Sequence, residues 1–154
     1  MPINIVLVEP EIPQNTGNIA RTCALTRTKL HLVKPLGFSI EDRYLKRAGL
    51  DYWDKVDIQV WDSFSDIIKA YASSKIYLAT TKAERSYHQV QYNQDDMLVF
   101  GRETRGLPDD ILNAYPEQRV RIPMLDIGRS LNLSNSAAIM IYEALRQQQF
   151  PGLR

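Results

Sequence analysis

The sequence predicts an α/β domain with a mostly parallel sheet flanked by helices. Two observations lead to this prediction. Short apolar runs alternate along the chain with segments of helical periodicity, which is the order expected when crossover helices connect parallel strands. The chain of 154 residues is also 44% hydrophobic and contains no internal repeat, low-complexity tract or Pro/Gly-rich linker. We therefore expect residues 1–154 to form one domain with a substantial core.

Each predicted strand is a short apolar run bounded by polar or turn-forming residues. The first run is rich in β-branched side chains, and the second ends at the turn-forming sequence KPLG. The predicted strands cover residues 3–8, 30–33, 57–61, 76–81, 97–100 and 119–123. Residues 82–95 are polar, so we expect them to form a loop.

The predicted helices have apolar residues on one face or begin at a typical capping residue. Asn15 or Thr16 is the expected N-cap of the first helix, and its Ile19 and Cys23 share an apolar face. Ser63 is the expected N-cap of the third helix. The predicted helices cover residues 17–28, 43–48, 64–72, 108–115 and 134–149.

Composition narrows the range of functions. The net charge is +1, so a nucleic-acid partner would have to meet a local basic patch rather than a global positive field. Cys23 is the single cysteine, which leaves no disulfide within one chain. The first residues lack the basic segment and long apolar run of a signal peptide, and no run approaches the roughly 20 apolar residues of a membrane span. We therefore expect a cytoplasmic protein without a membrane partner.

In open parallel sheets, ligands bind outside the carboxyl ends of the strands. The first strand is followed by EPEIPQNTGNIAR, which opens a helix. Free N–H groups and a positive dipole end at a helix start suit an anion such as an RNA phosphate, and Arg21 lies one turn further on. A capped helix with a solvated arginine explains the same pattern equally well.

Two further loops carry polar or glycine-rich sequences. FGRETRGLP follows the fifth strand, and its Gly101 and Gly106 allow close backbone approach or positive φ angles. A surface loop with a salt bridge from Glu103 is the alternative. IPMLDIGRSLNLSN places several polar side chains before the last helix, although one of them suffices as a cap. A helix cap with solvated polar residues is the alternative, and the excess of polar groups is what suggests a ligand.

Several familiar chemistries are absent from the sequence. The first strand is followed by neither a dinucleotide-binding G-x-G-x-x-G nor a P-loop. His31 and His88 have no partners at metal-ligand spacing, so no metal is expected. Cys23 is expected to be a small core residue. The residue pattern by itself therefore predicts a polar site at the sheet edge without naming its ligand.

Taken together, the three loops resemble the three motifs of the SPOUT superfamily of RNA methyltransferases. NTGNIAR is similar to the first motif, FGRETRGLP to the second and IPMLDIGRSLNLSNSAAIMIYEA to the third, in the same order and spacing. EPEIPQNTGN and KRAGLDYW are similar to the subgroup that methylates the tRNA wobble ribose. The resemblance implies a deep C-terminal trefoil knot, a single SPOUT domain and a homodimer with active sites at the subunit interface.

The resemblance further implies 2′-O-methylation of the ribose at tRNA position 34, a cytidine or uridine. S-adenosyl-L-methionine would be the methyl donor, S-adenosyl-L-homocysteine the product and the tRNA anticodon stem-loop the partner, with no metal. By this resemblance the adenine would be held by backbone groups in the third motif. The implied cofactor-binding residues are Ala79, Thr80, Thr81, Gly101, Glu103, Gly106, Ile122, Met124, Ser130 and Leu131.

Catalytic and RNA-binding roles also follow from the resemblance. Arg21 matches the first-motif arginine, whose expected role is electrostatic because arginine stays protonated. The implied catalytic residues are Arg21, Ser134, Asn135 and Tyr142. The implied RNA-binding residues are Asn15, Arg43, Lys46, Arg47, Arg105 and Arg129. Arg102 departs from the family, which often has a small residue or proline there, and we expect it to touch RNA or solvent.

Two alternative functions remain at this point. One is 2′-O-methylation of another tRNA position or of ribosomal RNA, for which many relatives use an extra N-terminal RNA-binding domain. The other is a non-catalytic α/β module that binds RNA or a nucleotide. Mapping the modified nucleotide distinguishes the first alternative from wobble methylation. A turnover assay distinguishes the second alternative from an enzyme.

Overall fold

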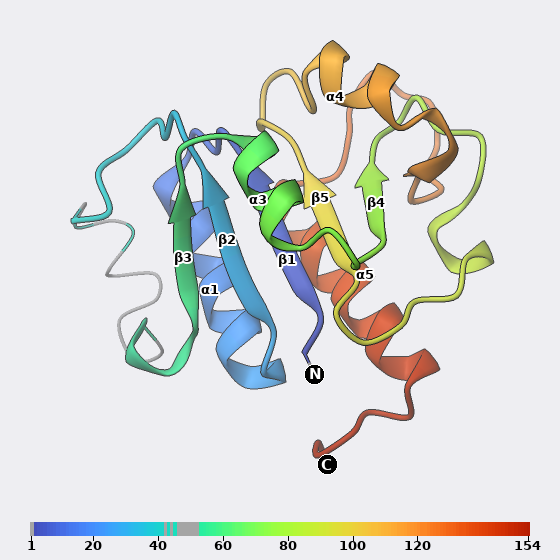
Figure 1. Cartoon of the computed structure of the whole chain (residues 1–154). Coiled ribbons are helices and arrows are strands. Elements are labelled where there is room, and N and C mark those ends of the chain that lie inside the picture. Colours follow the sequence, from blue (N-terminus) through green and yellow to red (C-terminus); the bar gives the residue numbers. More distant parts are fainter. Residues whose placement is uncertain (1, 42, 44, 46–52) are drawn as a thin grey trace.

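The computed structural model describes residues 2–41, 43, 45 and 53–154, and these residues form three layers around one sheet. Six parallel strands follow the order β3-β2-β1-β5-β4-β6 (Figure 1). The strands are β1 (Asn4–Val8), β2 (Lys29–Val33), β3 (Ile58–Trp61), β4 (Ile76–Ala79), β5 (Met97–Phe100) and β6 (Arg119–Val120). The predicted α/β class and mostly parallel sheet are confirmed.

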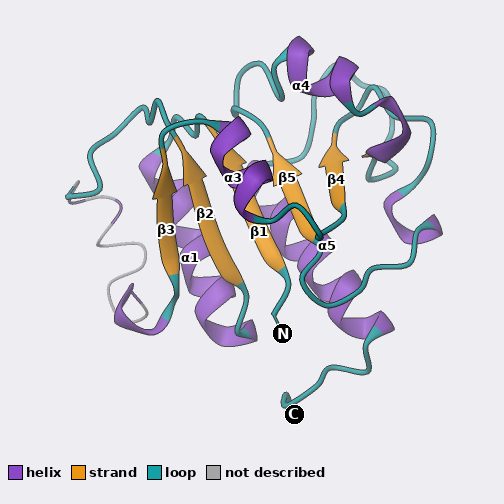
Figure 2. Ribbon diagram, viewed as in Figure 1, coloured by secondary structure: helices purple, strands orange, loops and turns teal. Residues whose placement is uncertain are grey.

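Helices cover both faces of the sheet, as Figure 2 shows. The α-helices are α1 (Pro13–Thr26), α3 (Phe64–Ala70), α4 (Asp109–Ala114) and α5 (Leu133–Gln147). The short 3-10 helices are η1 (Trp53–Lys55), η2 (Tyr87–Gln89) and η3 (Pro116–Gln118). No helix in the described part of the chain is both long enough and apolar enough to cross a membrane.

Alternate side chains of the central strands divide the core into two clusters, because successive residues of a strand point to opposite faces. On β1, Ile5 and Leu7 belong to the cluster that includes α1 and α5, which pack against each other. Val6 and Val8 belong to the cluster that includes α3 and α4. Burial on both faces explains why the central strands are apolar at nearly every position.

The first helix begins four residues earlier than predicted. Pro13 occupies its first turn, where a missing N–H costs little, and Ile12 is the N-cap without a side-chain hydrogen bond. The predicted cap at Asn15 or Thr16 is therefore wrong, because both residues lie inside α1 and are buried. The helix ends at Thr26 because Arg27 adopts a left-handed conformation with φ 57°.

Other element boundaries agree only in part with those predicted. Ser63 caps α3 as predicted by accepting the Asp66 N–H. The predicted strand 119–123 pairs with β4 only over β6, and the next residue, Arg121, instead bridges to Ser86. Within the predicted loop 82–95 lies η2, which the sequence analysis missed. Most of the predicted helix 43–48 lies outside the described residues.

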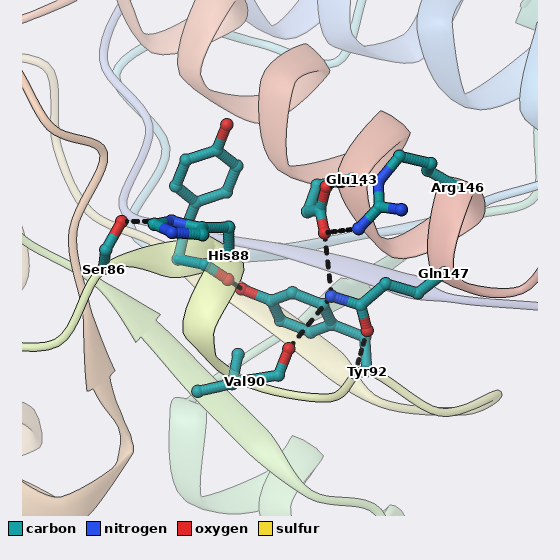
Figure 3. Close-up of polar contacts among 8 residues, drawn as sticks. Ser86, His88, Val90, Tyr92, Glu143, Arg146 and Gln147 are labelled. Carbon is teal, nitrogen blue, oxygen red and sulfur yellow. Dashed lines mark hydrogen bonds and ion pairs between the residues drawn. The ribbon is translucent and has the colours of Figure 1, made fainter.

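The end of α5 is anchored to the segment before β5, as Figure 3 shows. The Gln147 amide accepts the Tyr92 N–H at 2.8 Å and donates to the Val90 carbonyl at 2.9 Å. It also donates to Glu143 at 2.8 Å, and Glu143 forms a two-pronged ion pair with Arg146. These bonds hold the last turn of α5 against the segment that precedes β5.

His31 on β2 is fully buried, and each of its two ring nitrogens has a hydrogen-bond partner. Trp61 Nε1 donates to His31 Nδ1 at 3.0 Å, and His31 Nε2 lies 2.9 Å from Asn4 Oδ1. Because an indole N–H can only donate, the proton of the neutral ring belongs on Nε2. Burial, together with the nearby positive charge of Lys29, lowers the pKa of His31 to about 4.

This buried histidine predicts a specific loss of stability in mild acid. An unfolded histidine has a pKa of about 6.5, so between pH 6.5 and 4 the unfolded chain binds a proton that the folded chain does not. The His31 contribution to the free energy of unfolding should fall by about 2 kcal/mol from pH 7 to pH 5. Urea unfolding at pH 7 and pH 5 should show a smaller fall in the free energy of unfolding for His31→Gln than for the wild type. Equal falls in the two proteins would contradict the prediction.

Candidate active site at the carboxyl edge of the sheet

A cavity of about 510 Å³ lies at the carboxyl edge of β4 and β5, a volume that suits a small organic ligand. Most of its lining comes from three segments: residues 79–82 at the end of β4, residues 100–107 at the end of β5, and seven residues of the segment that leads into α5. These seven are Ile122, Met124, Ser130, Leu131, Asn132, Leu133 and Ser136, and Ile12, Asn15 and Leu112 complete the wall. These segments are far apart in the sequence, and the parallel sheet brings their ends together.

All ten residues predicted to bind the cofactor line this one cavity. They are Ala79, Thr80, Thr81, Gly101, Glu103, Gly106, Ile122, Met124, Ser130 and Leu131. Asn15 and Arg105, predicted to bind RNA, line it as well. The structure therefore places the three motif loops around a common space, and ligand binding by these residues stays a prediction.

The loop after β5 is a tight hairpin closed by its own backbone. Arg102 and Gly106 exchange two N–H···O bonds of 3.1 and 2.9 Å, and Gly106 adopts a φ of 69°. A Cβ on Gly101 would lie 2.1 Å from the Gly106 carbonyl carbon and from the Leu107 nitrogen. Gly101 is therefore required by the fold of the loop itself, in which close backbone approach, one of the two roles predicted for this glycine, leaves no room for a Cβ.

Two carboxylates join this hairpin to the start of α1. Glu103 Oε2 accepts the N–H groups of Glu11 at 3.0 Å and Ile12 at 2.6 Å. In return, Glu11 Oε1 accepts the Thr104 N–H at 3.1 Å and the Thr104 hydroxyl at 2.8 Å. We call this reciprocal arrangement of Glu11, Ile12, Glu103 and Thr104 the carboxylate latch.

The two carboxylates of the latch have opposite electrostatic environments. Hydrogen bonds from Thr104 lower the pKa of Glu11, and the nearby positive charges of Arg102 and Arg105 lower it further. Burial raises the pKa of Glu103, although the N–H groups of Glu11 and Ile12 partly offset this effect. Glu103 lies beside the N-terminus of α1, where its negative charge is favourable and where it accepts the N–H of the N-cap residue Ile12.

Asn132 explains part of the polar excess before the last helix. Its Oδ1 caps α5 by accepting the N–H groups of Ser134 at 2.9 Å and Asn135 at 3.3 Å. It also accepts the Ser134 hydroxyl at 2.6 Å. Its Nδ2 donates to Asn15 Oδ1 at 3.1 Å, which ties α5 to α1. With the cap supplied by one residue, Ser130 is left to line the cavity.

The third wall of the cavity includes residues whose backbone N–H groups are not used in the main-chain hydrogen bonds of the fold. Across the described ranges, the amides of Ile122, Met124 and Leu131 donate no backbone hydrogen bond. All three residues line the cavity beside apolar groups such as Leu107 and Leu112. Apolar walls with available backbone donors and acceptors fit a flat aromatic ring with polar edges, such as adenine.

The predicted catalytic residues do not gather in this cavity. Arg21 lies on the exposed side of α1, and Tyr142 lies on the exposed side of α5, where its ring is 6.4 Å from that of Phe150. Ser134 and Asn135 form the first turn of α5, next to the cavity. Within a single chain, Arg21 and Tyr142 do not line the cavity wall.

The predicted RNA-binding residues fall into two groups. Arg43, Arg105 and Arg129 are exposed, as a phosphate contact requires. Asn15 is instead buried and accepts the hydrogen bond from Asn132. Lys46 and Arg47 lie outside the described residues.

Three groups of residues at the site were not predicted from the sequence. Glu11 and Thr104 complete the carboxylate latch, Ile12 and Lys82 line the cavity, and Asn132 connects the two helices. Lys82 could have been found, because it directly follows the predicted segment 79–81. The latch joins pairs of residues that are separated by 92 and 93 positions in the sequence. No local pattern reveals such a pairing.

An open parallel sheet with a polar cavity at its carboxyl edge defines a ligand-binding protein of the α/β class. The model of the SpoU rRNA Methylase family matches residues 2–142. A tRNA (cytidine(34)-2′-O)-methyltransferase from Methylovorus glucosotrophus is 53% identical over 150 residues, covering 97% of each chain. The chain belongs to the SpoU rRNA methylase family, and the resemblance to SPOUT RNA methyltransferases is confirmed.

Solved structures support the same assignment. One from a study of the 2-OH methylation of C/U34 on tRNA has a TM-score of 0.91 at 41% identity, covering 96% of each chain. An AdoMet-bound rRNA methyltransferase from Sinorhizobium meliloti has a TM-score of 0.83 at 23% identity. That match covers 94% of this chain and 56% of the other, and it shows a shared fold.

Proposed function

We propose that this protein transfers a methyl group from S-adenosyl-L-methionine to the ribose 2′-oxygen of the tRNA wobble nucleotide, a cytidine or uridine at position 34. One observation carries the proposal: ten residues that the motif resemblance assigns to the cofactor line a single cavity. The full-length similarity to a tRNA (cytidine(34)-2′-O)-methyltransferase supports the same substrate. The protein would act in the cytoplasm as a single domain of residues 1–154.

The residues present fit the proposed cofactor. Backbone groups of Ile122, Met124 and Leu131 would bind the polar edges of the adenine, and the apolar wall would cover its faces. Gly101 and Gly106 keep the hairpin narrow and leave room beside it. When bound, the cofactor supplies an electrophilic methyl group on its sulfonium, and S-adenosyl-L-homocysteine is the product. No metal has a part in this proposal.

The protein must also activate the ribose 2′-hydroxyl, which is a poor nucleophile. A ribose hydroxyl has a high pKa, so methyl transfer is favoured by positive charge near the oxygen as its proton leaves. Arg21 would provide this charge and orient an RNA phosphate, while remaining protonated. Ser134 and Asn135, at the start of α5, would lie near the reacting groups.

A homodimer would complete the site. Because Arg21 and Tyr142 lie away from the cavity of their own chain, we propose that a second protomer brings its Arg21 to this cavity. Exposed apolar side chains support such an interface: Tyr142 and Phe150 are 47% and 40% exposed, and Leu125 and Ile127 are 79% and 74% exposed. A buried interface would cover these groups.

We further propose that the C-terminal segment forms a trefoil knot. β6 lies at the sheet edge beyond β4, whereas α5 packs beside α1 on the far side of β5 (Figure 1). The connecting segment, residues 121–132, must therefore cross the ends of β4 and β5, where it lines the cavity. Threading of this segment would shape the cofactor site in the manner of the superfamily.

The tRNA would bind through exposed basic side chains. Arg105 and Arg129 lie on the loops around the cavity, and Arg43 lies on the segment after β2. These residues, with Lys46 and Arg47, would contact phosphates of the anticodon stem-loop. Affinity should then fall steeply with salt, since each neutralised phosphate releases a bound counterion.

The test is methyl transfer from labelled S-adenosyl-L-methionine to unmodified tRNA, with the product nucleotide mapped by nuclease digestion and mass spectrometry. We expect a 2′-O-methyl group at position 34. The matched control is the same tRNA with a 2′-deoxynucleotide at that position, which lacks the acceptor oxygen and should remain unmethylated. Methylation of another position or of ribosomal RNA would replace the proposed substrate, and cofactor binding without any transfer would favour a non-catalytic module.

A further inference from the structure

Arg102 has an unusual position in the cavity wall. It lies in the hairpin after β5, its side chain is half-buried, and its Nε is fully buried. This Nε–H has no hydrogen-bond partner among the residues that the structure describes. A buried donor of a charged group is costly to leave without an acceptor, and in the wall of a cavity a bound ion or ligand can supply that acceptor.

The nearest carboxylates are already engaged elsewhere. Glu11 accepts two hydrogen bonds from Thr104, and Glu103 accepts the N–H groups of Glu11 and Ile12. Hydrogen bonds from Thr104 lower the pKa of Glu11 most, and the positive charge of Arg102 lowers it to a smaller degree. Neither carboxylate forms a hydrogen bond or ion pair with Arg102 within the described part of the chain.

The other cations of the cavity differ from Arg102. Lys82 pairs with Asp109 at 3.5 Å, and Arg105 is exposed to solvent. Arg102 alone among these three combines a partly buried guanidinium with a buried donor that lacks an acceptor. A guanidinium presents paired N–H groups that match the two oxygens of a carboxylate or a phosphate.

We propose that Arg102 binds an anionic oxygen group of the ligand in this cavity. The inference rests on the proposed function, which offers two sources of that chemistry: the carboxylate of the methionine part of the cofactor, and a phosphate of the RNA. The backbone of Arg102 is held independently by its two bonds to Gly106, so the side chain can be changed without opening the hairpin.

The first arm of the test concerns the cofactor. Calorimetry should compare S-adenosyl-L-homocysteine with 5′-methylthioadenosine, which keeps the nucleoside thioether but lacks the amino-acid end. If Arg102 binds the carboxylate, Arg102→Gln should raise the Kd for S-adenosyl-L-homocysteine about tenfold and leave that for 5′-methylthioadenosine unchanged. Arg102→Lys, which keeps the charge but loses the paired donors, should give an intermediate value.

The second arm concerns RNA. If Arg102 binds a phosphate, Arg102→Gln should leave both nucleosides unaffected and weaken tRNA binding, with the slope of log K against log salt reduced by about one. The control is Lys69→Gln, which removes a positive charge from α3 at a position that does not line the cavity. This control should retain wild-type affinity for both nucleosides.

The outcomes separate cleanly. Either affinity change supports the inference and identifies the source of the anion. Wild-type affinities of Arg102→Gln for both nucleosides and for tRNA would overturn it. Failure of the wild-type protein to bind S-adenosyl-L-homocysteine would instead refute the proposed function. Should Arg102→Gln fold poorly, Arg102→Lys carries the cofactor arm, because it keeps the charge but loses the paired donors. Arg102→Met, which removes the charge and keeps a long side chain, then carries the RNA arm.

Discussion

Replacing Arg21 with alanine should lower the rate of methyl transfer by about 10²–10³-fold, the usual loss when one electrostatic contact to developing charge is removed. The affinity for S-adenosyl-L-homocysteine should stay within about twofold of wild type, because Arg21 lies on the surface of α1 and does not line the cavity of its own chain. Single-turnover kinetics with tRNA and calorimetry with the product measure the two quantities separately.

The matched control is Arg27→Gln, which removes one positive charge from the other end of the same helix. It should methylate tRNA at close to the wild-type rate. A loss of product binding in Arg21→Ala would show that this arginine supports the cavity rather than the transfer step. Equal rates for Arg21→Ala and wild type would remove Arg21 from the proposed mechanism.

Substituting Gly101 with alanine should lower the stability of the protein more than any other glycine-to-alanine substitution at this site. The added Cβ would lie 2.1 Å from backbone atoms of Gly106 and Leu107, and backbone atoms cannot move aside as a flexible side chain can. We expect the free energy of unfolding to fall by about 3 kcal/mol or more, with loss of product binding as the hairpin opens. Denaturant unfolding and calorimetry measure the two effects.

Gly106→Ala provides the comparison within the same hairpin. Its Cβ would meet no atom within 4 Å, so the substitution costs only the positive φ of 69°, about 1 kcal/mol. Gly101 has no positive φ, so if both variants lost the same stability, the hairpin would have to relieve the collision at Gly101 by moving. If Gly101→Ala were as stable as wild type, the hairpin would have to differ from the one described.

Much of the site was predictable because its residues follow strands in the sequence. The segments 79–81, 101–106 and 122–131 each begin where an apolar run ends, and parallel strands carry their following loops to one edge. That local rule, together with the motif resemblance, selected the ten residues predicted to bind the cofactor, and all ten line one cavity. Strand positions were similarly robust, because burial on both faces leaves a continuous apolar run.

Features that depend on contacts between distant segments were not predictable. The start of α1 was misplaced because Asn15 and Thr16 have typical capping side chains, yet the helix begins at Pro13 and its N-cap residue Ile12 is held by a hydrogen bond to the distant Glu103. The short β6 was overestimated because Arg121 pairs with the segment around Ser86 instead of with β4. In each case a tertiary hydrogen bond outweighed a local preference.

The carboxylate latch has a consequence for communication between ligands. Glu11 and Glu103 join α1, which carries Arg21, to the hairpin that forms one wall of the cavity, so a shift of either part is resisted by the other. Any strengthening of cofactor binding by docked RNA must then be matched by an equal strengthening of RNA binding by cofactor, because coupling free energies are reciprocal. Cutting the latch should reduce both effects by the same factor, even though neither glutamate need touch the RNA.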